Sequence, residues 1–262
     1  MGRTKTICFC NNKGGSGKST SCSNIGYAMS LLGYRVLLID GDMQLNLSLS
    51  FFDEDDVLEM AKGERNLYMA VKNGRDLQDY IVPTPYENLD IIPSSTLMSS
   101  IEYELFAKWQ REFILKKALR SVRESEKYDV ILIDAPPTLG GWVINILCAS
   151  DKMIIPVESS PWGLFGLANM FEFLGGAKEI APELELMGIA ITKVDERKNY
   201  FRQTVETLRE LEDVKVFENY IHVDRAIEWA QDDSSPVLVY KKSSRSAKEY
   251  YELAKEVIAL CQ

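Results

Sequence analysis

Apolar residues along this chain alternate between short continuous runs and longer stretches with helical spacing. The short runs, such as residues 128–134 and 151–157, are typical of strands that are buried on both faces of a parallel sheet. In the longer stretches, apolar residues recur three and four positions apart, which predicts helices with one buried face. The alternation of these two patterns predicts an α/β fold with a mostly parallel central sheet flanked by helices on both faces.

The predicted elements follow one another without a flexible linker or an internal repeat. Strands are predicted at 6–10, 35–40, 89–93, 128–134, 151–157 and 186–192. Helices are predicted at 21–32, 66–72, 99–124, 161–175 and 244–260, with a further short one near 77–81. The acidic segment 51–65 is predicted to be irregular, with a surface turn at 53–56. One domain that covers residues 1–262 is therefore expected.

A glycine-rich loop joins the first predicted strand to the first predicted helix. Its residues are Lys13, Gly14, Gly15, Ser16, Gly17, Lys18, Ser19 and Thr20. A strand, a loop ending in Gly-Lys-Ser and a helix form the context of a P-loop, whose backbone N–H groups bind a phosphate chain. In such a loop Lys18 reaches the β- and γ-phosphates and the Ser19 hydroxyl binds Mg²⁺. The alternative, a glycine-rich turn without a ligand, is disfavoured by the regular strand and helix on either side.

Three acidic residues stand at the ends of predicted strands. They are Asp40, Asp42 and Asp134. Ligands of open α/β sheets bind beyond the carboxyl ends of the strands, so these side chains are expected to point toward the P-loop. Asp134 is the candidate Walker B residue, which holds Mg²⁺ through water. For Asp40 and Asp42 the alternative is a pair of acids that only cap a strand end, and the neighbouring P-loop favours the functional interpretation.

Three segments together resemble the deviant Walker A ATPases of the ParA/MinD (Soj-like) family. They are residues 13–20, Asp40-Gly41-Asp42-Met43-Gln44-Leu45-Asn46, and Asp134-Ala135-Pro136-Pro137-Thr138-Leu139-Gly140. The resemblance implies ATP and Mg²⁺ as cofactors, and a Lys13 that crosses a dimer interface to the partner's nucleotide. It also implies that Asp42 orients or activates the attacking water, that Asp40 supports the water shell of Mg²⁺, and that residues 134–140 act as a switch.

The chain departs from the family pattern in two loops. Met43 and Leu45 stand where relatives carry proline and glycine. His222 and Val223 stand where relatives carry proline and arginine, in a loop that lies near the adenine base in the family. His222 is the only histidine and has no accompanying nucleophile motif, so it is interpreted as a loop or pocket-lining residue.

Composition limits the compartment and the partners. The net charge of −9 argues mildly against wholesale nucleic-acid binding, although a local basic patch is compatible with it. No apolar stretch approaches the roughly 20 residues of a membrane span, and no signal peptide is recognised before the first strand. The five cysteines lack zinc-site spacing, and Cys8 and Cys10 are expected to be small core residues in a reducing cytoplasm.

Three classes of function fit this resemblance: a ParA-like partition ATPase, a MinD-like ATPase acting at a membrane or on a protein partner, and a metabolic or metallocluster enzyme. Mixed charges on the helix at 244–260 disfavour a membrane-targeting tail, and the cysteine positions disfavour a cluster. We therefore expect a cytoplasmic, nucleoid-associated partition ATPase. This class implies an ATP-dependent homodimer, nonspecific DNA binding and a ParB-like centromere-binding partner that stimulates hydrolysis.

Nonspecific DNA binding requires a basic surface that dimerisation creates or completes. The candidates are Lys193, Arg197, Lys198, Arg202, Arg225, Lys241, Lys242 and Arg245. Acidic residues nearby leave open the alternative that these are solvated surface charges.

Overall fold

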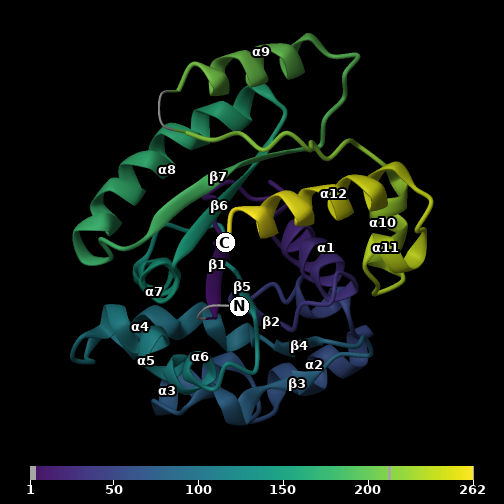
Figure 1. Ribbon diagram of the computed structural model, residues 1–262. Helices are drawn as coiled ribbons and strands as arrows, with labels where there is room; N and C mark the ends of the chain where they lie inside the picture. Colours follow the sequence, from purple (N-terminus) through teal and green to yellow (C-terminus); the bar gives the residue numbers. More distant parts are fainter. Residues whose placement is uncertain (1–3, 212–213, 262) are drawn as a thin grey trace.

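The computed structural model describes residues 4–211 and 214–261, and a seven-stranded sheet forms the centre of this part of the chain (Figure 1). The order across the sheet is β3-β4-β2-β5-β1-β6-β7. The strands are β1 Lys5–Phe9, β2 Val36–Asp40, β3 Val82–Pro83, β4 Leu89–Ile92, β5 Val130–Asp134, β6 Lys152–Glu158 and β7 Glu185–Thr192. Every neighbouring pair is parallel except β3 with β4. The predicted mostly parallel sheet is therefore confirmed.

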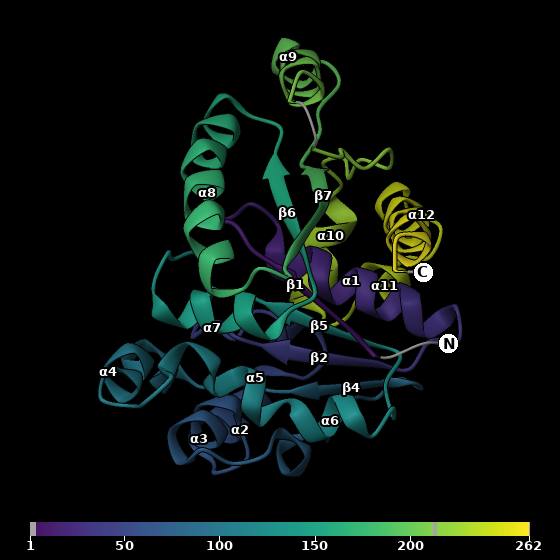
Figure 2. The same ribbon diagram turned by 60° about the vertical axis from the view of Figure 1, so that its left-hand side comes forward.

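Helices cover both faces of this sheet. The α-helices are α1 Lys18–Leu31, α2 Glu54–Lys62, α3 Leu67–Asn73, α4 Ile101–Phe106, α5 Ile114–Ala118, α6 Arg120–Glu124, α7 Gly141–Ala149, α8 Pro161–Ile180, α9 Asn199–Arg209, α10 Arg225–Asp232, α11 Val237–Tyr240 and α12 Arg245–Ala259. The 3₁₀ helices are η1 Ser48–Ser50, η2 Leu77–Tyr80, η3 Thr96–Ser100 and η4 Arg111–Phe113. Figure 2 shows α1 and α12 on one side of the sheet, and α7 and α8 on the other. Across residues 4–211 and 214–261, no helix combines the length and apolar character needed to traverse a bilayer.

Alternate residues of β1 supply two separate hydrophobic cores. Ile7 and Phe9 are fully buried in the core that includes α1 and α12. Cys8 and Cys10 are fully buried in the core that includes α7 and α8. This follows from the two-residue period of a strand, which sends successive side chains to opposite faces. The two cysteines are thus small core residues, as expected, and burial raises the pKa of both thiols.

The register of the central strands brings the candidate acids together. Asp40 of β2 pairs with Asp134 of β5, and Asp134 pairs on its other side with Phe9 of β1. Because the three strands are parallel, their carboxyl ends lie at one edge of the sheet, where the loop after β1 also begins. The acids therefore stand beside the P-loop.

The prediction of one long helix at 99–124 is wrong. The segment is divided into η3, α4, η4, α5 and α6. Gln110 adopts a left-handed backbone conformation (φ 51°), which no α-helix can contain. The side-chain oxygen of Asn145 then accepts hydrogen bonds from the backbone N–H groups of Ile114 (3.1 Å) and Leu115 (3.2 Å), where α5 begins. The apolar periodicity survives these breaks because each short helix still packs on the same core.

The prediction of an irregular acidic segment at 51–65 is also wrong, because α2 occupies most of it. Asp53 caps this helix by accepting a hydrogen bond from the Asp56 N–H at 2.9 Å. The acidic residues of its first turn interact favourably with the positive end of the helix dipole. The acidic run is therefore a helix start rather than a turn. Helices α9, α10 and α11 were not predicted from the sequence pattern.

Leu45 adopts a glycine-like backbone conformation in the loop after β2. Its φ is 62°, in the left-handed region that leucine rarely occupies. Its side chain is nevertheless 5% exposed, and it belongs to a small apolar cluster with Val57 and Ala61 of α2. The loop thus keeps the shape that glycine would provide, and burial of the leucine offsets a backbone strain of about 1–2 kcal/mol.

The strained backbone at Leu45 predicts that a glycine variant is at least as stable as an alanine variant at this position. Leu45→Ala is expected to lower the free energy of unfolding by about 2–4 kcal/mol, because it removes a buried side chain and keeps the strained backbone. Leu45→Gly removes the same contacts and relieves the strain, so it should be no less stable than the alanine variant. Urea denaturation of both variants measures this. A glycine variant less stable by more than about 1 kcal/mol, as in an ordinary helix or strand, would contradict the strain argument.

Candidate nucleotide-binding site

The loop between β1 and α1 has the backbone of a phosphate cradle. Gly15 and Gly17 have φ values of 72° and 88°, which L side chains rarely adopt. Gly17 is the N-cap of α1, and no side chain accepts the N–H groups of the first turn there. The positive end of the helix dipole and these N–H groups favour binding of an anion.

Lys18 lies inside this loop rather than on the surface. Its side chain is buried, and its Nζ donates a hydrogen bond to the carbonyl oxygen of Lys13 at 3.3 Å. Burial lowers the pKa of this ammonium, and the nearby carboxylates of Asp134 and Asp42 counteract the effect. A buried cation among acids is suited to interact with a highly charged phosphate chain.

Asp40 and Asp42 shape the loop after β2 in different ways. The Asp40 carboxylate accepts hydrogen bonds from the backbone N–H (2.9 Å) and the hydroxyl (2.7 Å) of Ser48, and from the Asp42 N–H (3.2 Å). Burial raises the pKa of Asp40 to about 6. Asp42 accepts only the Gln44 N–H, at 3.1 Å, and it lines the cleft above the P-loop. Asp40 therefore holds the loop, and Asp42 faces the site.

Asp134 is the acid that most clearly fits a cation. Both of its carboxylate oxygens are buried without a hydrogen-bond partner among the described residues. Burial and the charge of Asp40 raise its pKa well above the ordinary value. Two orphaned carboxylate oxygens are costly, and a hard divalent cation or its water shell would satisfy them. Ser19, on the first turn of α1, lines the cleft above the P-loop, and its side chain lies near Asp134. The residues thus fit Mg²⁺.

Lys13 is held within its own chain. Its Nζ forms an ion pair with Glu158 and donates a hydrogen bond to the Ser160 hydroxyl at 3.1 Å. Its backbone N–H donates to the Asn11 side-chain oxygen at 2.9 Å. The sequence analysis missed Glu158, which ends β6, because no motif links two positions so far apart.

Gly41 joins the acidic strand ends to the start of α7. A Cβ atom at this position would lie 2.6 Å from the carbonyl oxygen of Asp134, so only glycine permits the approach of the two strands. The Gly41 carbonyl accepts a hydrogen bond from the Trp142 indole at 2.9 Å, and Glu102 accepts the Trp142 N–H at 2.9 Å. Residues 134–140, the predicted switch, thus lead from the end of β5 to the start of α7, and Pro137 among them lines the cleft.

The cleft has a second wall, formed by residues at the end of β7, in the loop 221–224, in α10 and in α12. The volume of the whole cleft is about 700 Å³. The residues that line this wall are Thr192, Lys193, Ile221, His222, Val223, Asp224, Ile227, Glu228, Gln231 and Tyr250. The Thr192 hydroxyl donates to the Ser16 carbonyl at 2.8 Å, which joins β7 to the P-loop. His222 is pocket-lining, as predicted. Its partners Glu196 and Glu249 were missed, since neither belongs to a motif.

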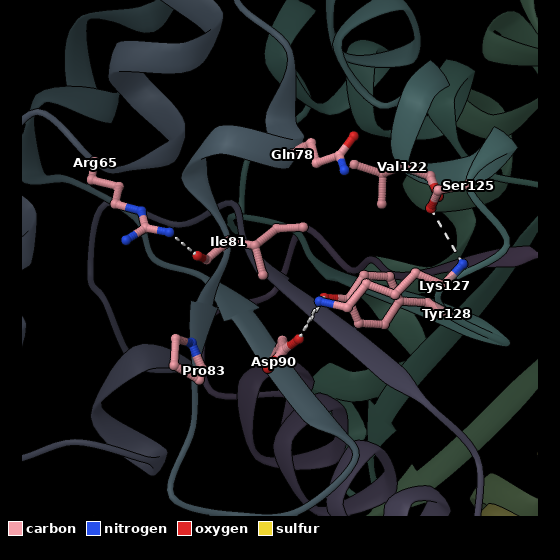
Figure 3. A pocket seen from close by; sticks show the side chains of 9 residues that line it. All are labelled: Arg65, Gln78, Ile81, Pro83, Asp90, Val122, Ser125, Lys127 and Tyr128. Carbon is pink, nitrogen blue, oxygen red and sulfur yellow. Dashed lines mark hydrogen bonds and ion pairs between the residues drawn. The ribbon is translucent and has the colours of Figure 1, made fainter.

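Another pocket lies at the opposite, amino ends of the strands (Figure 3). Asp90 of β4 accepts a hydrogen bond from the Tyr128 hydroxyl at 2.5 Å and pairs with the Lys127 ammonium at 3.1 Å. Arg65 donates to the Ile81 carbonyl, also at 2.5 Å. Within this pocket Asp90 and Lys127 thus compensate each other's charge, and Arg65 is held by a backbone carbonyl, in keeping with a structural role.

Comparison with known proteins decides the family. A family model described as "AAA domain" matches residues 4–186. The sporulation initiation inhibitor protein Soj of Bacillus subtilis is 35% identical over 97% of this chain and 98% of its own length. The chain belongs to the ParA/Soj family of P-loop ATPases.

Solved structures similar to this ParA/Soj family member contain nucleotides. A putative plasmid partition protein from Borrelia burgdorferi bound to AMPPNP is 25% identical with a TM-score of 0.81, covering 98% of this chain and 99% of that one. A cobyrinic acid a,c-diamide synthase from Mycobacterium smegmatis with a bound ATP analogue and magnesium is also 25% identical, with a TM-score of 0.82 and coverages of 97% and 94%.

The candidate DNA-binding residues of this family member do not form one group. The ammonium of Lys193 lies against the P-loop, 3.7 Å from where a Gly15 side chain would begin, and it lines the nucleotide cleft. Arg197 pairs with Asp195, and Arg245 pairs with both Glu196 and Glu249. The others are exposed without an ion pair among the described residues, and they are Lys198, Arg202, Arg225, Lys241 and Lys242.

Proposed function

We propose that this ParA/Soj family member is an ATPase of DNA partition, with residues 1–262 acting as one domain. It binds ATP with Mg²⁺, forms a sandwich homodimer around the nucleotide, binds DNA without sequence preference, and hydrolyses ATP when a centromere-binding partner stimulates it. The observation that carries the proposal is the P-loop with its additional lysine, Lys13, beside the acids Asp42 and Asp134, in a chain 35% identical to Soj. We place it in the cytoplasm, on the nucleoid.

The site residues divide the work of phosphoryl transfer. The N–H groups of the loop and the Lys18 ammonium neutralise the phosphate oxygens, and such positioning and charge stabilisation supply most of the catalysis in this reaction class. Asp42 has carboxylate capacity left after its single hydrogen bond from Gln44, so it is able to accept a proton of the attacking water. Ser19 and Asp134 would hold Mg²⁺, which would further neutralise the phosphate charge.

Lys13 joins nucleotide binding to dimerisation in this proposal. Within one chain it is occupied by Glu158 and Ser160. In the dimer it leaves these partners and contacts the phosphates bound to the other subunit. The ion pair is about a quarter exposed on each side, so water screens it in part, and in this proposal the phosphate contacts outweigh the cost of leaving Glu158. ATP thereby bridges two subunits.

Duplex DNA binding by the Asp42→Ala variant tests this function. With ATP, the variant is expected to form a stable dimer that binds random-sequence DNA, and with ADP to bind far more weakly. The affinity should fall at least tenfold between about 50 and 200 mM salt, because several phosphate contacts release counterions. Sedimentation and fluorescence anisotropy give the two readouts. Lys13→Ala in the same background is the matched control, and it should bind ATP yet neither dimerise nor bind DNA.

The outcomes separate the parts of the proposal. An ATP-dependent dimer that does not bind DNA at low salt would replace partition by a switch that acts on a protein or membrane partner. Unchanged dimerisation of the Lys13→Ala variant would overturn the role of Lys13. Removing charge at Arg225, Lys241 and Lys242 together should weaken DNA binding and leave ATP binding intact, because these side chains are exposed and none of them is among the residues that line the cleft.

A further inference from the structure

His222 lies between two carboxylates at the second wall of the cleft. Its Nδ1 is 2.7 Å from Glu249 Oε1, and its Nε2 is 2.7 Å from Glu196 Oε1. Arg245 completes a closed arrangement, since its guanidinium donates to Glu249 Oε1 at 2.7 Å and to Glu196 Oε1 at 2.9 Å. These four side chains are called the His222 ring below.

The His222 ring fastens three segments to one another. Glu196 belongs to the loop after β7 (193–198), His222 to the loop 221–224, and Arg245 and Glu249 to α12. The backbones of Val194 and His222 form a β-bridge, and the His222 N–H donates to Glu249 Oε2 at 2.9 Å. Lys193 and residues 221–224 line the nucleotide cleft, so the ring determines the shape of this wall.

The geometry of the His222 ring favours a protonated histidine. Ionised carboxylates only accept hydrogen bonds, and a neutral imidazole carries a single N–H. Both ring nitrogens face a carboxylate oxygen, so only the imidazolium satisfies both contacts. With a neutral imidazole, the two carboxylates and the one guanidinium leave one negative charge uncompensated. The His222 side chain is 10% exposed and that of Glu249 16%, so water screens the contact between these two side chains poorly.

Loss of the His222 proton removes hydrogen-bond donors mainly from Glu196. Glu249 keeps the His222 backbone N–H and the Arg245 guanidinium as donors, whereas Glu196 is 58% exposed and keeps only Arg245. The loop that carries Glu196 also carries Lys193, whose ammonium lies against the P-loop. Deprotonation of His222 therefore loosens the segment that places Lys193 beside the phosphate site.

Other charged groups on these segments are already engaged or at a distance from the ring. Asp195 pairs with Arg197, and Asp224 caps α10 and accepts from Ser246. On α12, Glu252 pairs with Lys255, and Lys248 is exposed. None of these has a recorded contact with the His222 imidazole among the described residues. Glu196, Glu249 and Arg245 are thus the charged groups whose contacts change when His222 gains or loses its proton.

We propose that His222 is a positioning residue of the nucleotide cleft, whose protonated form holds the 193–198 loop against α12 and thereby strengthens nucleotide binding at low pH. The proposal rests on the proposed ATP binding. It gives the wall of the cleft a proton-dependent contact between the 193–198 loop, the loop 221–224 and α12.

The test is the affinity for a fluorescent ATP analogue, with Mg²⁺, measured from roughly pH 5.5 to pH 8.5. Because the phosphates also titrate, the quantity compared is the ratio of wild-type to variant affinity at each pH. Relative to His222→Gln, the wild type should bind about tenfold more tightly at the acid end and equally at the alkaline end, the usual effect of one charge-assisted hydrogen bond. His222 is the only histidine, so proton NMR reports its titration directly, and the two midpoints should coincide.

Two further variants make the result decisive. Glu196 is exposed, so the Glu196→Gln variant should fold normally. Its affinity for the ATP analogue should lose the same pH dependence as that of His222→Gln. Glu252→Gln, which lies on α12 and pairs only with Lys255, should behave as the wild type. Identical pH profiles for the wild type and Glu196→Gln would overturn the role of the ring. Absence of nucleotide binding by the wild type at every pH would instead overturn the proposed function.

Discussion

Replacing Lys18 by alanine should weaken ATP binding by at least about 100-fold and reduce hydrolysis below detection. The size follows from the loss of a buried positive charge at the phosphates, in a cleft where Asp134 and Asp42 then face the anion without a counter-charge. Isothermal titration with ATP and Mg²⁺ measures the binding, and phosphate release measures the hydrolysis.

The control for this variant is Lys116→Ala, which removes an exposed lysine of α5 far from the loop. It should leave both quantities unchanged. Thermal unfolding should also show that Lys18→Ala is folded, with a lowered unfolding temperature because the change leaves the buried carboxyl groups of Asp134 and Asp42 without their neighbouring positive charge. If the folded Lys18→Ala variant bound ATP as the wild type does, the loop would not be the phosphate site.

Replacing Asp42 by asparagine should lower the rate of hydrolysis about 10²- to 10³-fold and leave ATP affinity within a few-fold of the wild type. Asparagine keeps the oxygen that accepts the Gln44 N–H, so the loop retains its shape and only the proton acceptor is lost. Single-turnover hydrolysis and equilibrium binding separate the two effects.

Asp40→Asn provides the contrast. Its carboxylate accepts three hydrogen bonds from Ser48 and Asp42, so this change should disturb the loop and shift the unfolding temperature as well as the rate. Asp42→Asn should not change the unfolding temperature. Normal hydrolysis by Asp42→Asn would show that another group positions the water, and equal unfolding shifts in both variants would contradict the division of roles between the two acids.

The parts of the fold that sequence analysis predicts are those determined by neighbouring residues. The buried strands and the P-loop follow from local runs, and the strand order then places Asp40 beside Asp134. The break at Gln110 was not predictable in this way, because Asn145, about thirty positions further on, supplies the acceptor that starts α5. Proximity of that kind exists only in the folded chain.

The candidate site shows the same division. Lys18 and Asp42 carry motif signals, whereas Glu158 and Glu249 are ordinary surface-type residues until folding brings them to Lys13 and His222. Leu45 is an intermediate case. The resemblance to the family implies a glycine at its position, but only the structure shows that the loop has a glycine-like conformation there and buries the side chain.

The two margins of the sheet limit how copies of this protein can assemble. On one side β3 has two residues, one of them Pro83, which has no N–H to offer. On the other side the chain after α9 covers β7, with hydrogen bonds from Phe217 N–H to Ile189 O (3.0 Å) and from Ile221 N–H to Ile191 O (2.9 Å). Strand addition is therefore blocked at both margins, which protects a crowded protein from fibre-like aggregation. The ATP-dependent dimer proposed above would therefore have to form through surfaces other than the sheet margins.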